Sequence, residues 1–445
     1  MRVVVAGDCL FSSRNLAKRL DPKIVSEFKN ADAVAANAEF TCPNLENTPP
    51  AAGRGYITSV REETLNEFSE LNIKLVNFAN NHTGDFGIDG MKNTIDASRK
   101  RGLIPTGVGL SLDEARLPKF VDTPNGRFGI VSAAATRSER FVASNAGGEV
   151  IARPGLAPLR WNRSYVLPES LFKNLQTIDE ALGTAEAFRV CNNIEIKAPF
   201  TDEQFKFGSM FEGSLDIKKG DKAHVETIYN VSDAIELLKS VRDAANRSDF
   251  NIVSIHTHEG LNNNWYSLIP AEFIQKFARE VIDNGADAFV GHGAHFMRGV
   301  EIYKGKPIFY NLGSLLMEFE TGSSIISPEM YSTYGLPTNS RPSDLHRMRA
   351  NDPKTGEFRG FNGDPMFSRN AVAIFDTSED KLSFKLLPLD LNMRRVHRME
   401  RGIPYIVTPK VGHEIAEFLT KASTQWNTIL KFNEETGYID IGVPH

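Results

Sequence analysis

The sequence predicts an α/β protein with a mostly parallel sheet and a polar site at the strand ends. Up to about residue 135, short apolar strands alternate with amphipathic helical stretches, which is typical of βαβ units. Residues able to bind a metal follow several of these strands. In open α/β sheets a site forms outside the carboxyl ends of the strands. We therefore expect these polar residues to converge on one shared site.

The first part of the chain follows this alternation closely. The strand VVVAG leads into a helical stretch that runs to Lys29, and the next strand is AVAAN. The helix REETLNEFSELN, the strand KLVNFAN and the helix IDGMKNTIDASRKRG come next, before the strands IPTGVG and FGIVSAAAT. Each apolar run is short enough for a buried strand, and each helical run carries the apolar residues at helical spacing.

Two segments interrupt the pattern. Residues 137–230 contain scattered Gly, Pro and Asn, a predicted helix at 168–182 and the strand candidates FKFGSMFEG and HVETIYN, so we expect an insertion or cap. Residues 316–368 are rich in Pro, Gly, Ser and Arg, and a long loop of this kind in a compact enzyme is usually a lid or substrate wall. Both are expected to be elaborations of a single domain spanning residues 1–445.

The regular pattern resumes after each interruption. A helix at 232–246, the strand NIVSIHTH, the helix AEFIQKFAREVIDNG and the strand DAFVGH precede a hairpin, GVEIYKGKPIFYNLG. Lys304-Gly305 forms the predicted turn of that hairpin. The strands NAVAIFDT and LSFKLLPLDL follow, and helices are predicted from Val411 to Phe432.

Composition narrows the class of protein. The chain has 445 residues, 41% apolar and 24% charged, and its net charge of -5 is spread without a basic patch, so we expect no nucleic-acid partner. Three cysteines, Cys9, Cys42 and Cys191, lack paired spacing, which suits a reducing compartment. Without a leader or a run of roughly 20 apolar residues, we expect a soluble, cytoplasmic protein with no membrane anchor. The sequence does not indicate an oligomeric state.

The polar residues at the strand ends are oxygen and imidazole donors, which suit Zn, Mn or Fe. Two such ions about 3.5–4 Å apart would activate a water and brace the attacking and leaving oxygens. A carboxylate usually bridges them, and Asp8 and Glu39 are the candidates. The donors are Asp8, Glu39, Asn81, His82, His256, His258, His292 and His295.

Several of these residues have a structural alternative. Asp8 and Glu39 could cap the helices that follow them, and Asn80 and Asn81 could be turn residues. His258 could be a ligand, support a ligand or contact the substrate. Cys9 is expected to point into the core rather than to bind a metal.

The same segments carry a family resemblance. AGDCLF, ADAVAANAEF, FANNHTGDFGIDGMKNTIDA and PTGVGLSLDEA, followed by VSIHTHEG and NGADAFVGHGAHFMRGVEIYKGKPIFYNLGS, resemble the CapA family of poly-gamma-glutamate synthesis and capsule biosynthesis proteins. This family is a branch of the calcineurin-like metallophosphoesterases. NNHTGDFG and GHGAH with its hairpin are the specific parts of the match.

The resemblance implies a four-layer α/β/β/α sandwich, here with two insertions, and metals at the strand ends. It also implies that His82 is the acid that protonates the leaving group or that it steadies the developing charge, and that Asp85 orients His82. The implied ligands are Asp8, Glu39, Asn81, His256, His292 and His295. The chain departs from the pattern at Leu10, where a ligand histidine is usual, at His258, where a small residue is usual, and at the NLGS of residues 311–314.

These observations predict a metal-dependent hydrolase with two divalent ions, Mn, Fe or Zn. It would act on a phosphoester or amide bond, including a glutamyl amide, in a small anionic substrate. His258, Arg341 and Arg347 are the predicted substrate contacts, since guanidinium groups pair well with carboxylate or phosphate. The alternative is a non-catalytic accessory protein of poly-gamma-glutamate or capsule synthesis that binds the anionic polymer.

Overall fold

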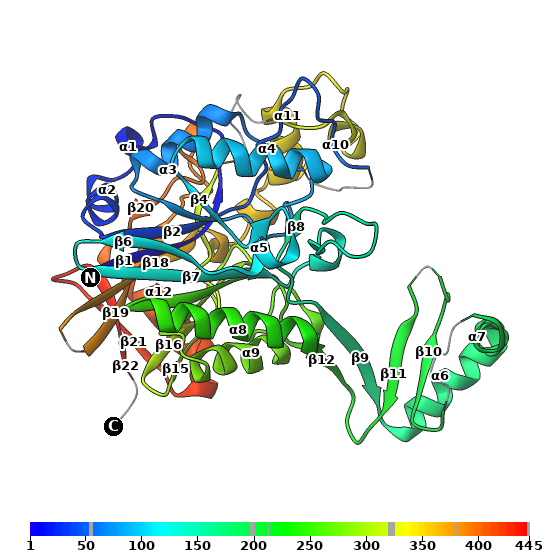
Figure 1. Cartoon of the computed structure of the whole chain (residues 1–445). Coiled ribbons are helices and arrows are strands. Elements are labelled where there is room, and N and C mark those ends of the chain that lie inside the picture. The colour runs from blue at the N-terminus through cyan, green and yellow to red at the C-terminus, as the bar shows by residue number, and fades with distance from the viewer. Residues whose placement is uncertain (53–56, 196–200, 212, 319–324, 380, 443–445) are drawn as a thin grey trace. The chain divides into compact units, whose positions relative to one another are not determined.

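The structure is a computed structural model that describes residues 1–52, 57–195, 201–211, 213–318, 325–379 and 381–442 (Figure 1). The chain forms two compact units. The first comprises Met1–Arg160, Val231–His258 and Phe277–His445, and the second comprises Trp161–Asn230 and Glu259–Lys276. The segment expected as the first insertion, 137–230, thus contributes residues to both units. Within the two expected insertions, residues 196–200, 212 and 319–324 lie outside the described residues.

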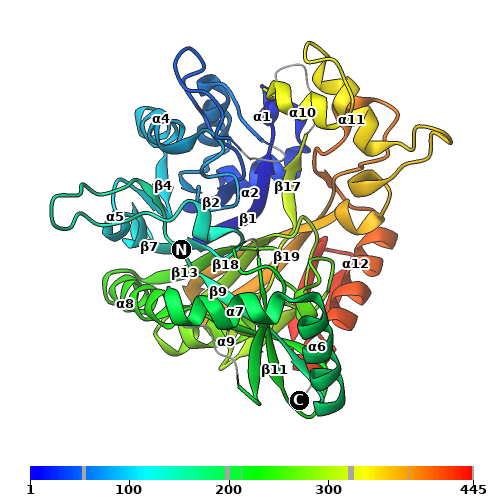
Figure 2. The same cartoon turned by 90° about the vertical axis from the view of Figure 1, so that its right-hand side faces the viewer.

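The larger sheet of the first unit holds the N-terminal strands. Its order is β21-β22-β19-β18-β1-β2-β3-β4, with β17 also paired to β1 and β20 to β19. The strands β1 to β4 and β17 run parallel, and Figure 2 shows β17 beside β1. Its members are β1 (Arg2–Leu10), β2 (Ala33–Ala38), β3 (Leu75–Asn77), β4 (Ile104–Thr106), β17 (Ser314–Met317), β18 (Arg369–Glu379), β19 (Lys381–Asp390), β20 (Tyr405–Ile406), β21 (Ile429–Asn433) and β22 (Tyr438–Gly442).

The second sheet of this unit has the order β15-β16-β14-β13-β7-β6. β7, β13, β14 and β16 are parallel, and the hairpin of β15 and β16 turns at Lys304 and Gly305, both with positive φ, as predicted. The strands are β6 (Lys119–Thr123), β7 (Gly126–Ala134), β13 (Phe250–Thr257), β14 (Ala288–Gly293), β15 (Val300–Tyr303) and β16 (Lys306–Phe309).

The two sheets pack face to face. Alternate residues of a strand point to opposite faces: in β1, Val3 and Val5 lie in one core cluster and Val4 lies in another. The cluster with Val3 and Val5 also contains residues of β7 and β13, and the rings of Phe250 and Phe375 meet across it at 5.2 Å. The cluster that contains Val3 and Val5 is therefore the apolar layer between the two sheets.

Helices cover the two outer faces. Val4 shares its cluster with apolar residues of α2, α3 and α4, while α8 packs on β7 and β13 (Figure 1). This confirms the predicted four-layer α/β/β/α sandwich. The helices of this unit include α1 (Leu16–Arg19), α2 (Pro22–Lys29), α3 (Asn66–Glu70), α4 (Gly87–Lys100), α5 (Leu112–Arg116) and α8 (Val231–Arg247), and α9 (Glu272–Asp283) belongs to it from Phe277 onward.

The C-terminal prediction was wrong in part. Helix α12 (Pro409–Ala422) is capped by Thr408 and ends at Ala422, whereas the helices were predicted to extend to Phe432. Residues Ile429–Asn433 instead form β21, which pairs antiparallel with β22. Leu430 and Ile439 lie in the core between the sheets, so burial in the sheet decides the conformation of this short apolar run.

The second unit is a small α/β structure. Its sheet has the order β10-β11-β9-β12, with β9 (Trp161–Leu167), β10 (Gln204–Phe207), β11 (Leu215–Lys219) and β12 (His224–Tyr229). Helix α6 (Glu169–Leu182) confirms the helix predicted at 168–182, and α7 (Thr184–Ile194) follows it. Phe172, Phe205 and Ile217 form its core, with the two phenyl rings 5.0 Å apart and nearly perpendicular.

The segment predicted as a lid loop, 316–368, contains regular structure. Leu316 and Met317 end strand β17, and the segment includes α10 (Pro328–Thr333) and α11 (Pro342–Ala350). Both helices have Pro at their first position, where the missing N–H costs nothing. The three cysteines are free and buried, and Cys9 lies in the core as expected. Among the described residues, no helix has both the length and the apolar character needed to cross a membrane.

Candidate metal centre

A row of polar residues crosses the first sheet at the carboxyl ends of its parallel strands. Asp8 in β1 is in register with Asn37 in β2, Asn37 with Asn77 in β3, and Asn77 with Thr106 in β4. The second sheet adds His256, which is in register with His292 of β14. The sheet registers thus bring residues from distant parts of the sequence to one place, as the strand-end pattern predicted.

The loops after the strands supply the remaining donors. Glu39 directly follows β2, and its backbone N–H donates to the carbonyl of Cys9. A tight turn after β3 holds the Asn-His pair, because the side chain of Asn80 accepts the backbone N–H of His82 at 3.0 Å. Asp8 lies inside β1 and helix α2 is capped by Asp21, so Asp8 is not a helix cap.

The backbone around His295 is unusual. Gly293 has φ 114°, and a Cβ at this position would lie 3.0 Å from the ring of His256. His295 itself has φ 63°, in the left-handed region that residues other than Gly rarely adopt. Such conformations persist where the surrounding structure imposes them, often at functional sites.

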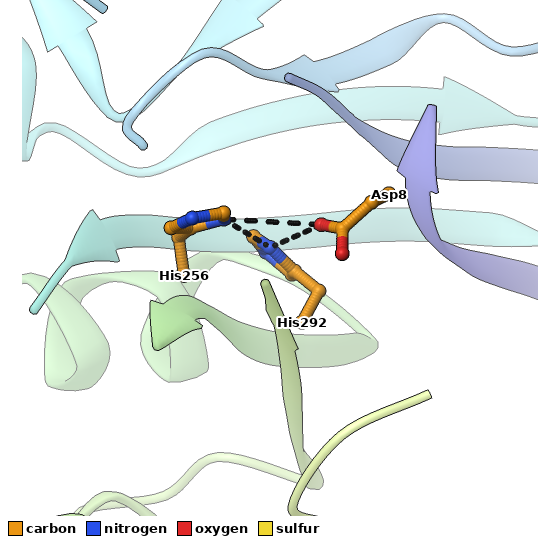
Figure 3. A group of neighbouring side chains, drawn as sticks. All are labelled: Asp8, His256 and His292. Atoms are coloured by element: carbon orange, nitrogen blue, oxygen red, sulfur yellow. Dashed lines mark hydrogen bonds and ion pairs between the residues drawn. The ribbon is translucent and has the colours of Figure 1, made fainter. Parts of the chain in front are cut away.

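Asp8, His256 and His292 form the first group of possible ligands (Figure 3). Oδ1 of Asp8 lies 3.8 Å from Nδ1 of His256 and 3.4 Å from Nδ1 of His292, and the two Nδ1 atoms are 3.2 Å apart. The other ring nitrogen of His292 faces the hydroxyl of Ser254 at 3.0 Å, which leaves Nδ1 for the group.

Asp8, Glu39 and His295 form a second group. Nδ1 of His295 lies 3.3 Å from Oδ2 of Asp8 and 3.6 Å from Oε2 of Glu39. The two oxygens of Asp8 therefore face different groups, so Asp8 is placed as a bridging carboxylate would be. A third group combines Glu39, His256 and His258.

The charges of this cluster fit a cation. Glu39 is fully buried, and its two carboxylate oxygens accept no hydrogen bond from the described residues. Burial raises the pKa of Glu39 well above its usual value, and the negative charges of Asp8 and Asp85 add to the rise. A divalent ion would supply the missing positive charge, so these donors suit one.

Asp8 and the histidines respond differently to burial. Burial opposes the charge of Asp8, but hydrogen bonds and positive charge from His292 and His295 hold its pKa well below the usual value. Burial lowers the pKa of His256 and of His258 well below the ordinary value. Neutral imidazoles beside ionised carboxylates are the forms that bind a metal.

His82 and Asp85 form a pair at the edge of the cluster. Nδ1 of His82 lies 2.7 Å from Oδ2 of Asp85, which also accepts the backbone N–H of Thr58 at 3.0 Å. Nε2 of His82 points the other way and lies 3.7 Å from Oε1 of Glu39. The pair holds one imidazole nitrogen toward the cluster, the arrangement expected of an oriented acid or base.

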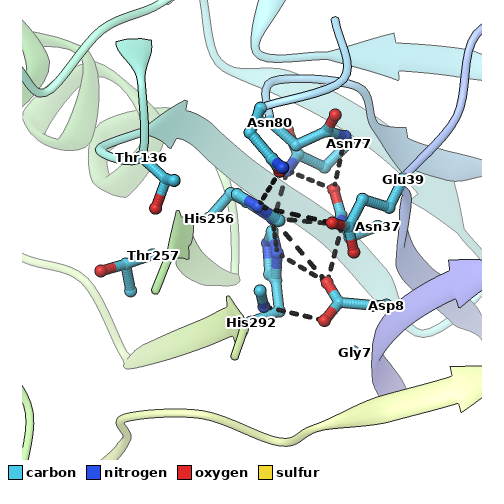
Figure 4. Close-up of polar contacts among 12 residues, drawn as sticks. Gly7, Asp8, Asn37, Glu39, Asn77, Asn80, Thr136, His256, Thr257 and His292 are labelled. Carbon is cyan, nitrogen blue, oxygen red and sulfur yellow. Dashed lines mark hydrogen bonds and ion pairs between the residues drawn. The ribbon is translucent and has the colours of Figure 1, made fainter. Parts of the chain in front are cut away.

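The sequence interpretation missed a buried amide network. Nδ2 of Asn37 donates to Asp8 at 2.8 Å, and the side-chain oxygen Oδ1 of Asn37 accepts from Asn77 at 2.9 Å and from Asn80 at 3.2 Å (Figure 4). Asn77 and Asn80 thus hold the side chain of Asn37, which in turn holds the carboxylate of Asp8. Their signal in the sequence is a polar residue that interrupts an apolar strand, as in AVAANAE and KLVNFAN.

The remaining predicted residues divide between the cluster and the surface. Oδ1 of Asn81 lies 2.7 Å from Nε2 of His256, within the cluster. Arg341 pairs with Asp344 at 3.2 Å, and its side chain is 80% exposed. Arg347 lines a hollow of about 500 Å³ with Arg398 and Arg401, and no residue of the ligand groups lines this hollow.

One residue of the segment 316–368 does reach the cluster. The ring of Phe361 packs edge-on against the ring of His295 at 5.3 Å, and it also packs against Phe367 at 4.8 Å. The sequence interpretation considered the arginines of this segment and not its aromatic residues. An apolar wall at this position limits access of water to that side of the cluster.

Comparison with known proteins places the chain among related sequences. It is 29% identical over 448 residues to the uncharacterized protein y4sH of Sinorhizobium fredii, covering 98% of this chain and 92% of that one. It is 21% identical over 325 residues to the PGA biosynthesis protein CapA of Bacillus subtilis, covering 72% and 63%. A novel phosphatase from Mycoplasma pneumoniae superposes with a TM-score of 0.38 at 11% identity, over 88% of this chain and 93% of that one.

The family assignment follows from a match that spans most of the first unit's strands. The model of the bacterial capsule synthesis protein family PGA_cap matches residues 2–318, which include the candidate ligands and His82 and Asp85. This confirms the resemblance found on the motifs, and the chain belongs to the bacterial capsule synthesis protein family PGA_cap.

Proposed function

We propose that the protein is a metal-dependent hydrolase with two divalent ions at the strand-end cluster. One observation carries the proposal: two carboxylates and four histidines, all buried, meet in overlapping groups whose donor atoms lie within 4.8 Å of one another. Such concentrations of buried ionisable groups are characteristic of functional sites. Oxygen and imidazole donors suit Mn, Fe or Zn.

Each ion would have its own donors. Asp8, His256 and His292 would hold one, and Asp8, Glu39 and His295 the other, with Asp8 shared between them. When bound, two such ions polarise the scissile group and provide a nucleophile at neutral pH. Asn37 and the backbone N–H of Gly293 keep Asp8 in place, because they donate to its two oxygens at 2.8 Å each.

His82 is the proposed general acid. Asp85 holds its Nδ1, so a proton on Nε2 is directed toward the cluster, where a leaving group would accept it. This role suits a phosphoester and an amide equally, since both leaving groups need a proton. The proposed substrate is therefore a small anionic molecule with either bond, including a glutamyl amide.

A second candidate function is favoured by the hollow beside Arg347. Arg347, Arg398 and Arg401 line it together with Phe358, and this basic surface would suit binding of an anionic polymer without catalysis. The family description of capsule synthesis is consistent with such an accessory role.

Reconstitution separates the two candidates. Metal-free protein is loaded with Mn²⁺, Fe²⁺ or Zn²⁺ and assayed on a panel of phosphomonoesters, phosphodiesters and glutamyl amides. A hydrolase gains turnover with metal and loses it in His82→Ala, with metal content retained. Polymer binding that survives metal removal, without turnover on any substrate class, would support the accessory function instead.

A further inference from the structure

The role of His258 in the cluster is not yet assigned, since it belongs to neither of the two proposed ion sites. It directly follows β13 and lies two residues after His256. Its ring lies 5.2 Å from the ring of His256 and 5.6 Å from the ring of His295, nearly perpendicular to the latter. Its exposure of 8% equals that of Asn81 and is close to the 7% of His295.

The backbone of His258 is held on both sides. Its N–H donates to the hydroxyl of Thr136 at 2.8 Å, and its carbonyl accepts from Nη2 of the fully buried Arg298 at 2.8 Å. These two hydrogen bonds fix the backbone from which the ring of His258 projects. Metal-binding residues are usually held by hydrogen bonds from neighbouring groups, which a mobile surface histidine lacks.

The neighbouring groups leave a place for one more donor. Asp8, Glu39 and His295 offer three ligand atoms, while Zn, Mn and Fe ions take at least four. A nitrogen of His258 lies within 4.8 Å of a carboxylate oxygen of Glu39. Donors bound to one ion at about 2.0–2.2 Å lie roughly 3–4 Å apart, so small side-chain shifts would bring this nitrogen into the set.

His256 is less suited to that place, although it shares a group with Glu39 and His258. Its Nδ1 faces Asp8 and His292, and its Nε2 lies 2.7 Å from Oδ1 of Asn81. A neutral imidazole carries a proton on one nitrogen and a lone pair on the other. With Nδ1 as the ligand nitrogen, Nε2 of His256 donates to Asn81, although it also lies 3.9 Å from Oε1 of Glu39. Of the third group, this leaves His258 as the imidazole available to an ion beside Glu39.

We infer that His258 is the fourth protein ligand of the ion held by Asp8, Glu39 and His295. The inference rests on the two-ion centre of the proposed function, and it is independent of whether that centre hydrolyses a substrate. It changes the predicted role of His258 from substrate contact to metal ligand. The ion that His258 would bind is a divalent metal ion, Zn²⁺, Mn²⁺ or Fe²⁺.

Calorimetric titration of the metal-free, full-length protein with Zn²⁺ or Mn²⁺ tests the inference. The wild type should bind two ions, and His258→Ala should bind one of them at least tenfold more weakly while the other is unchanged. His346→Ala is the matched control, since His346 is also buried but lies in α11 outside the ligand groups, and it should bind both ions normally. Bound metal after dialysis, measured by mass spectrometry, gives an independent count.

A second variant protects the test against misfolding. His258→Asp keeps a donor atom, so it should recover part of the affinity that His258→Ala loses, and the unfolding temperature of each metal-free variant reports on the fold. Unchanged affinity for both ions in folded His258→Ala would overturn the inference, as would a raised KM with both ions retained. Those outcomes leave the proposed hydrolase intact, whereas a wild type with two ions and no turnover would contradict only the hydrolase.

Discussion

Two regions of the molecule carry most of its candidate functional residues, and they differ in whether their charged groups are buried or exposed and paired. The strand-end cluster, formed by Asp8, Glu39 and the histidines around them, buries ionisable groups, and the charge of Glu39 lacks a balancing positive charge. In the arginine segment, residues 341–369, two of the arginines pair with carboxylates: Arg341 with Asp344, and Arg369 with Glu414. Concentrated, uncompensated ionisable groups indicate a site, whereas paired surface charges indicate structure.

The strongest test of this comparison removes two ligands from the cluster. His292→Ala combined with His295→Ala should abolish binding of both ions, because each of the two proposed ion sites loses one ligand. Activity on any substrate should fall to background. Bound metal measured by mass spectrometry after dialysis checks the expectation, with Arg341→Ala as the control from the other region. Full metal content in the double variant would remove the cluster as the metal centre.

A second test separates chemistry from binding within the cluster. His82→Ala should retain most of the metal but lower kcat by roughly 10²–10⁴-fold, the usual contribution of a general acid. Asp85→Asn should give a smaller loss, since it leaves the imidazole in place but changes the proton on Nδ1. Steady-state kinetics on a substrate found in the reconstitution screen decides this. If kcat is unchanged in His82→Ala, the histidine is structural.

The arginine segment should show a smaller effect, on binding alone. Arg347→Ala should raise KM by about threefold to tenfold with kcat and metal content nearly unchanged, because an exposed guanidinium contact contributes to binding throughout the reaction. Arg341→Ala should have little effect, since Arg341 already pairs with Asp344. Equal kinetics for Arg347→Ala and the wild type would exclude the hollow beside Arg347 from substrate binding.

The smallest expected effect concerns stability in acid. Burial, with the charge of Arg349, holds the pKa of His346 well below its ordinary value of about 6.5. The unfolded chain therefore takes up this proton first, so the contribution to stability is present above about pH 6.5 and is lost as the pH falls below it.

The unfolding temperature of metal-free protein should thus fall between pH 7.5 and pH 5.5. The fall should be smaller in His346→Gln, whose side chain does not titrate. His256 and His258 contribute to the fall in both proteins, so the difference between the two isolates His346. An identical fall in both would show that the environment of His346 does not disfavour its protonation.

The sequence predicted the parts of the site that strand register controls. Asp8, His256 and His292 lie in strands whose apolar runs are clear, and parallel pairing then brings their ends together whatever the chain does between them. Glu39 and the Asn-His turn come shortly after two further strands of this kind, β2 and β3. The strand and helix pattern alone predicted a mostly parallel α/β sheet, whereas the four-layer sandwich was predicted from the family resemblance.

The remaining features depend on contacts that no local pattern shows. Asn37 and Asn77 have the appearance of ordinary strand or turn residues until the register places them behind Asp8. Ile429–Asn433 has no periodicity that separates a short helix from a strand, and its pairing with β22 decides the outcome. The position of Phe361 against His295 follows from tertiary packing of a long segment with weak local signals.

The left-handed backbone of His295 has a consequence for the evolution and engineering of this chain. A residue with a Cβ at φ 63° costs roughly 1–3 kcal/mol relative to a relaxed conformation, and glycine would adopt it with less strain. Selection for stability alone would therefore favour glycine at this position. We therefore expect heat-resistant variants selected without an activity requirement to lose His295 early.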